Sequence, residues 1–116
     1  MSAPAAGGWT RVARLADLPD EALTAAALPD GRRVCLVRRR GAVQAIDDRC
    51  PHADFPLASG ELLPDGSVQC AWHGARFDPR TGARLDGPAC DAVATHDVLI
   101  HDGDVHVRSA RPVRAG

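Results

Sequence analysis

The chain has 116 residues, of which 45% are hydrophobic and 25% are charged, and its formal net charge is −1. This length predicts one domain with a modest core, because domains of about 100–150 residues are the most common. A nearly neutral chain lacks the basic surface that binds nucleic acid, and no stretch approaches the ~20 apolar residues of a membrane span. We therefore expect neither a nucleic-acid partner nor a membrane partner.

The start of the chain and its cysteine content bear on its location. Residues 1–8 lack the basic and apolar regions of a signal peptide, which favours a cytoplasmic protein. Four cysteines in that compartment argue against a disulfide framework.

Short apolar runs separated by turn residues predict an all-β fold. In chain order, strands are expected over residues 9–15, 34–37, 43–46, 93–100 and 105–108. Arg40-Gly41 separates the second and third of these strands, and Asp102-Gly103 between the last two is a strong signal for a two-residue hairpin turn. Residues 21–28 are ambiguous, since they have high helix propensity.

Two cysteine–histidine pairs dominate the middle of the chain. Cys50-Pro51-His52 and Cys70-Ala71-Trp72-His73 are separated by the seventeen residues 53–69. Each pair offers one thiolate and one imidazole, which suit iron or zinc. Zinc modules usually carry two cysteines on one arm and two histidines on the other, whereas each arm here carries one of each. This arrangement favours a [2Fe–2S] cluster whose two irons have different ligands.

The stretch from Cys50 to Pro88 resembles the Rieske iron–sulfur family. It contains C-P-H, an apolar-Pro-Leu loop at 55–57, C-x-W-H-G, F-D-x-x-T-G at 77–82 and a Gly-Pro loop at 87–88. The resemblance implies a Rieske-type β-sandwich base with an inserted cluster-binding lobe at about 47–90. It also implies a single domain over 9–109, flanked by flexible termini at 1–8 and 110–116. Because the family has a strand near residues 21–28, we expect a strand there.

The resemblance also implies a function and a ligand set. Cys50 and Cys70 would bind the inner iron of one [2Fe–2S] cluster, and His52 and His73 would bind the outer iron. The protein would be a soluble one-electron carrier, and not itself an enzyme, between a ferredoxin reductase and a terminal ring-hydroxylating oxygenase. Both partners would dock transiently at the His52/His73 surface, in a small interface. Because protein fills every ligand position, we expect no small-molecule substrate and no catalytic residue.

The surroundings of the cluster can be predicted in the same way. An apolar rim around the histidines is expected from Phe55, Pro56, Leu57, Trp72 and Pro88. High-potential members of the family carry a serine after the second histidine and an extra cysteine in each loop. The corresponding positions here are Ala75, Phe55 and Trp72, and the chain contains no tyrosine. We therefore predict a potential at the low end of the family range, near about −150 mV.

Two other functions stay open from the sequence: the small Rieske subunit of an assimilatory nitrite reductase, and a zinc-stabilised binding module without a redox role. The remaining reactive residues are expected to be structural. Cys35 and Cys90 are interpreted as buried and inert. The other polar candidates are expected at the surface or in solvated turns: His96, His101, His106, Asp47, Asp48 and the triplet at 38–40.

Overall fold

The computed structural model describes residues 8–50, 55–71, 74–86 and 92–108. Two antiparallel sheets contain the strands of these residues, which agrees with the all-β prediction. The larger sheet is the base, and its strand order is β1-β10-β9-β4-β3-β2. Its strands are β1 (Trp9–Arg14), β2 (Ala22–Ala27), β3 (Arg33–Arg39), β4 (Ala42–Asp47), β9 (Thr95–His101) and β10 (Asp104–Arg108).

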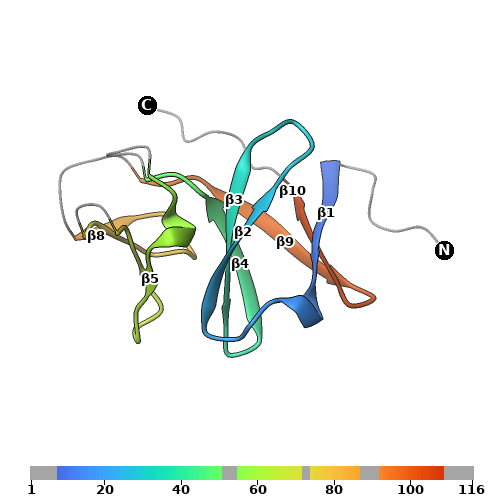
Figure 1. Ribbon diagram of the computed structural model, residues 1–116, viewed down its shortest axis with the longest axis horizontal. Coiled ribbons are helices and arrows are strands. Elements are labelled where there is room, and N and C mark those ends of the chain that lie inside the picture. Colours follow the sequence, from blue (N-terminus) through green and yellow to red (C-terminus); the bar gives the residue numbers. More distant parts are fainter. Residues whose placement is uncertain (1–7, 51–54, 72–73, 87–91, 109–116) are drawn as a thin grey trace.

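The smaller sheet forms a lobe between β4 and β9. Its order is β5-β6-β7-β8. Its strands are β5 (Glu61–Leu62), β6 (Val68–Gln69), β7 (Arg76–Phe77) and β8 (Arg84–Asp86). Two short 3-10 helices are also described, η2 (Leu15–Asp17) after β1 and η3 (Leu57–Ser59) before β5. In Figure 1 the lobe lies at the left end of the molecule, and strands β1 and β10 of the base lie toward the right end.

The hairpin turns of the base follow from the sequence. Arg40 and Gly41 join β3 to β4 with φ of 54° and 80°, and Asp102 and Gly103 join β9 to β10 with φ of 51° and 77°. Two successive residues with positive φ match the right-handed twist of the strands that they connect. Residues 22–27 form a strand, as predicted, because they pair along their whole length with β3. This pairing overrides their helix propensity.

Strand β3 is buried on both faces, and this divides the interior into two cores. Val34 and Leu36 face a core that the base sheet encloses together with Val105 and Val107. Cys35 and its neighbour on the same face, Val37, belong to a second core that is shared with the lobe. A strand with both faces covered reads as a continuous apolar run, which explains the unbroken pattern at 34–37.

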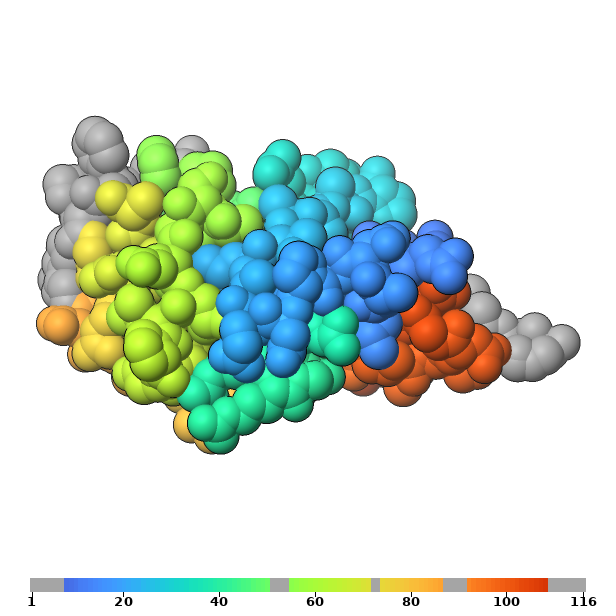
Figure 2. Space-filling view, turned by 60° about the horizontal axis from the view of Figure 1, so that its bottom comes forward, coloured from blue at the N-terminus to red at the C-terminus, as the bar shows by residue number. Residues whose placement is uncertain are grey.

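Two arginines connect the base to its surroundings. The guanidinium of Arg38 donates to the carbonyls of Leu15 and Leu18, at 3.0 and 2.7 Å. The guanidinium of Arg39 donates to the carbonyl of Pro64 in the lobe, at 2.6 Å. The prediction of a solvated turn at 38–40 is therefore wrong for these two residues, whose long side chains reach acceptors in neighbouring segments. In Figure 2 the lobe, lime to orange, packs against the blue and teal strands of the base.

Candidate metal centre

The two cysteines of the predicted ligand set lie in equivalent loops. Cys50 follows β4 and Cys70 follows β6. The amide of Cys50 donates to the carbonyl of Phe55 at 2.7 Å, and the amide of Cys70 donates to the carbonyl of Ala75 at 2.8 Å. Each bond joins a cysteine to the residue five positions later, so both loops are closed in the same way.

Both cysteines are buried at the bottom of these loops. Cys50 is 0% exposed and Cys70 is 1% exposed, and both belong to the core shared by lobe and base. Leu57, Ala75 and Phe77 pack in the same core. Two buried sulfur atoms in an apolar interior fit the inner side of an iron–sulfur cluster, where thiolate ligands are shielded from water.

The two histidines of the predicted set lie outside the described residues. His52 lies within the first closed loop along the chain, and His73 lies within the second. Among the residues that the structure describes, no group of three or more histidine, cysteine or acidic residues could hold a metal ion.

The turn after Cys70 depends on a glycine. Gly74 has φ of +76°, and its amide donates to the carbonyl of Cys70 at 3.0 Å. This φ lies in the left-handed region that glycine adopts without steric cost. The side-chain amide of Gln69 also donates to the carbonyl of Gly74, at 3.3 Å. Hydrogen bonds from Gln69, before Cys70, and from Gly74, after it, therefore stabilise the second loop.

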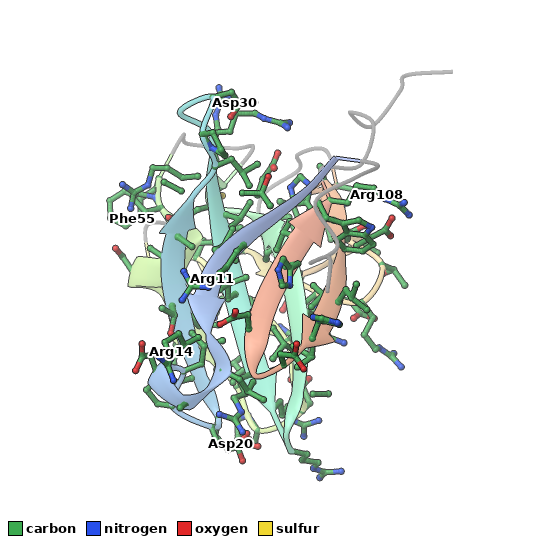
Figure 3. All side chains as sticks on the ribbon, turned by 90° about the vertical axis from the view of Figure 1, so that its right-hand side faces the viewer. Arg11, Arg14, Asp20, Asp30, Phe55 and Arg108 are labelled. Atoms are coloured by element: carbon green, nitrogen blue, oxygen red, sulfur yellow. The ribbon has the colours of Figure 1, made fainter. Side chains whose placement is uncertain are left out.

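The predicted apolar rim is partly wrong. Phe55 and Pro56 are half-buried and remain available at the surface. Leu57 is 0% exposed and belongs to the core beneath the loops, because η3 turns its side chain inward. Trp72 and Pro88 lie outside the described residues. Figure 3 shows Phe55 and Arg108 on opposite sides of the molecule.

Several polar residues that were expected at the surface or in solvated turns are buried. Asp48 has a side chain that is 0% exposed. His96 has a side chain that is 1% exposed, and its Nε2 lies 2.7 Å from Oδ1 of Asp47. His106 is 4% exposed, whereas His101 is half-buried. The sequence carries no local signal for this burial. His96 and His106 lie on paired strands of the base sheet, whereas Asp48 contacts η3.

Cys35 lies in the same core as the two loop cysteines but has a different chemistry. It is 0% exposed, as predicted for a small packed residue. Burial raises the pKa of its thiol, and the negative charge of Asp48 raises this pKa further. A thiol that stays protonated is a poor metal ligand and a poor nucleophile. Cys90 lies outside the described residues.

Comparison with known proteins identifies the family. The Rieske [2Fe-2S] domain model matches residues 8–97. The chain is 36% identical over 88 residues to the 3-phenylpropionate/cinnamic acid dioxygenase ferredoxin subunit of Photorhabdus laumondii, covering 69% of this chain and 84% of that protein. It is 38% identical over 79 residues to human apoptosis-inducing factor 3, but these cover 68% of this chain and only 13% of that protein.

A solved structure agrees with this assignment. The ferredoxin of carbazole 1,9a-dioxygenase from Nocardioides aromaticivorans IC177 superposes with a TM-score of 0.81 and 32% identity, covering 90% of this chain and all of that one. The match confirms the predicted Rieske-type fold. The chain therefore belongs to the Rieske [2Fe-2S] domain family, whose cofactor is a single [2Fe–2S] cluster.

Proposed function

We propose that this protein is a one-electron carrier that accepts an electron from a ferredoxin reductase and delivers it to a terminal ring-hydroxylating oxygenase. The proposal is supported by two relatives of similar length that are ferredoxins of dioxygenases. The match covers 84% of one relative and all of the other. Such a subunit transfers electrons and leaves substrate chemistry to its partner. The protein is accordingly not an enzyme by itself.

The ligand set of the cluster is part of the proposal. Cys50 and Cys70 bind one iron as thiolates, and His52 and His73 bind the other through one ring nitrogen each. The observation that carries this assignment is the pair of buried cysteines on two loops closed by the same backbone bond. When bound, the cluster supplies reversible one-electron chemistry. Since all four ligands come from the protein, no position is left for a substrate.

The surface for partners follows from this ligand set. The histidines give the electron its shortest exit, and the half-buried Phe55 and Pro56 lie beside the first of them along the chain. We place transient docking of both partners at the His52/His73 surface, in an interface below about 1,200 Å². No helix in the described part of the chain is long and apolar enough to cross a membrane. We place the protein in the cytoplasm, because Cys35 forms no disulfide, as is usual in a reducing compartment.

The central experiment measures metal content and redox behaviour. Protein purified anaerobically should contain two irons and two sulfides per chain and should show an electron-spin signal after reduction with dithionite. Cys50→Ser and His52→Ala should each abolish the native signal. Cys35→Ser is the matched control, because it removes a buried cysteine of the same core and should keep the cluster. A colourless protein that contains zinc would instead support the non-redox binding module.

An electron-transfer assay distinguishes the proposed function from the remaining alternative, the small subunit of a nitrite reductase. The reduced protein should be oxidised rapidly by a ring-hydroxylating oxygenase with its substrate present. Association only with a nitrite reductase large subunit, without oxidation by an oxygenase, would favour the nitrite reductase assignment.

A further inference from the structure

We propose that Asp48 is a positioning residue for the cluster: its buried carboxylate fixes the first ligand loop and places a negative charge behind the metal site that disfavours reduction. This inference rests on the proposed function, because it assumes that Cys50 is a cluster ligand. Asp48 follows β4 and precedes Cys50 by two residues. It was expected in a solvated loop, but its side chain is 0% exposed.

The carboxylate of Asp48 closes the first loop from outside. Its Oδ1 accepts a hydrogen bond of 2.7 Å from the amide of Ala58, in η3. Inside this bond, the amide of Cys50 donates to the carbonyl of Phe55. The two bonds are nested, from residue 48 to 58 and from residue 50 to 55. The side chain of Asp48 therefore fixes the position at which the chain leaves the ligand loop.

The charge of Asp48 is only weakly compensated by its described ion pair. Nε of Arg33 lies 3.4 Å from Oδ2 of Asp48, and the Arg33 side chain is 60% exposed. Arg33 and the Ala58 amide both donate to this carboxylate and so favour its ionised form. The exposed guanidinium is screened by water, so that it cancels only part of the negative charge. The charge acts on the core that holds the loop cysteines, because it helps to raise the pKa of Cys35 in that core.

The second loop shows that the fold itself does not need a carboxylate at this place. The residue two positions before Cys70 is Val68, which is 0% exposed and apolar. That loop is fastened instead by the neutral side chain of Gln69, which donates to Gly74. A neutral group thus suffices for closing a ligand loop of this kind. The carboxylate on the first loop adds charge, and a negative charge close to a metal centre disfavours addition of an electron.

Two substitutions separate the two effects. Asp48→Asn keeps an oxygen that can accept from Ala58 and removes the charge, whereas Asp48→Ala removes both. We expect Asp48→Asn to keep the iron content of the wild type and to shift the one-electron reduction equilibrium about tenfold toward the reduced form, which is about 59 mV. We expect Asp48→Ala to lose at least half of its iron during incubation with a chelator that leaves the wild type loaded.

Asp47→Asn is the matched control for charge. Its side chain is 38% exposed and lies one residue further from Cys50, so solvent screens it and the potential should move by less than a third of the Asp48→Asn shift. An unchanged potential in Asp48→Asn overturns the role of the charge, and unchanged iron retention in Asp48→Ala overturns the role in positioning. If Asp48→Ala does not fold, Asp48→Asn still decides the first question, and loss of its iron also contradicts the inference. Wild-type protein without iron would overturn the proposed function, and the inference with it.

Discussion

Gly82 is the residue at which the last turn of the lobe meets the base, and its replacement by alanine should weaken this junction. Its carbonyl accepts a hydrogen bond of 2.9 Å from the amide of Val93, just before β9. Its φ is +80°, and a Cβ at this position would lie 2.0 Å from the carbonyl oxygen of Val93. Since an ordinary contact is 3.4 Å or longer, the two segments would have to separate by about 1.4 Å.

The expected loss of stability has three contributions. A left-handed backbone costs a non-glycine residue about 1 kcal/mol. Overpacking at a contact that cannot relax costs about 1–3 kcal/mol, and a lost hydrogen bond costs about 0.5–1.5 kcal/mol. Together, Gly82→Ala should lower the free energy of unfolding by about 3–5 kcal/mol, a large share of the about 5–15 kcal/mol typical of a domain.

Gly41→Ala is a control that has the backbone cost of this substitution without the close contact. Gly41 has the same φ of +80°, but nothing lies within 4 Å of the position that its Cβ would take. This control should therefore lose only about 1 kcal/mol. Thermal unfolding of both anaerobic holoproteins, followed by circular dichroism, should lower Tm by about 4 °C in the control and by about 12–20 °C in Gly82→Ala. Equal Tm values in the two variants would refute the argument from close approach.

Three further outcomes are expected. Burial raises the pKa of Cys35, so the folded protein keeps this thiol protonated at a pH where the unfolded chain releases the proton. The free energy of unfolding should therefore fall as the pH rises above the ordinary thiol pKa of about 8.5, by at most about 1.4 kcal/mol per pH unit. Cys35→Ala should flatten this dependence on pH. Equal slopes of the unfolding free energy against pH in wild type and variant, from denaturant titrations between about pH 9 and 11, would contradict the assignment. Redox titration should give a midpoint near about −150 mV, and a value above about +100 mV would refute the reasoning from missing hydroxyl donors. Gly60→Ala should reduce the iron content per chain, since its Cβ would lie 1.9 Å from the carbonyl oxygen of Gln69, next to Cys70. Ser59→Ala changes an exposed residue and should keep the iron content, and equal iron in the two variants would show that the contact at Gly60 can relax.

The base sheet was predictable because its signals are local. Short apolar runs and the turn at Asp102-Gly103 indicate β9 and β10 without reference to the rest of the chain. Strand β2 was not predictable in this way, since residues 22–27 favour a helix by propensity. Its strand conformation comes from pairing with β3, and the prediction succeeded only through resemblance to a family.

The candidate ligands Cys50 and Cys70 come from spacing and residue type, which need no knowledge of the fold. The buried polar residues around them were not predictable in this way. Asp48 and His96 look like ordinary loop and edge residues in the sequence, and each is buried by a partner distant along the chain. Asp48 contacts η3 across the ligand loop, and His96 contacts Asp47 from a strand that begins 48 residues later. Such burial depends on tertiary contacts that a local pattern does not encode.

The alternation of β3 links the stability of the fold to the retention of the cofactor. Leu36 on one face packs in the core of the base, and Cys35 on the other packs in the core that contains Cys50 and Cys70. A shift of β3 by one residue would exchange these faces and disrupt both cores at once. The base therefore specifies the position of the strand that supports the cluster loops. If Cys50 and Cys70 hold the cluster as proposed, its binding should in return stabilise the core of the lobe, because metal binding contributes directly to folding free energy.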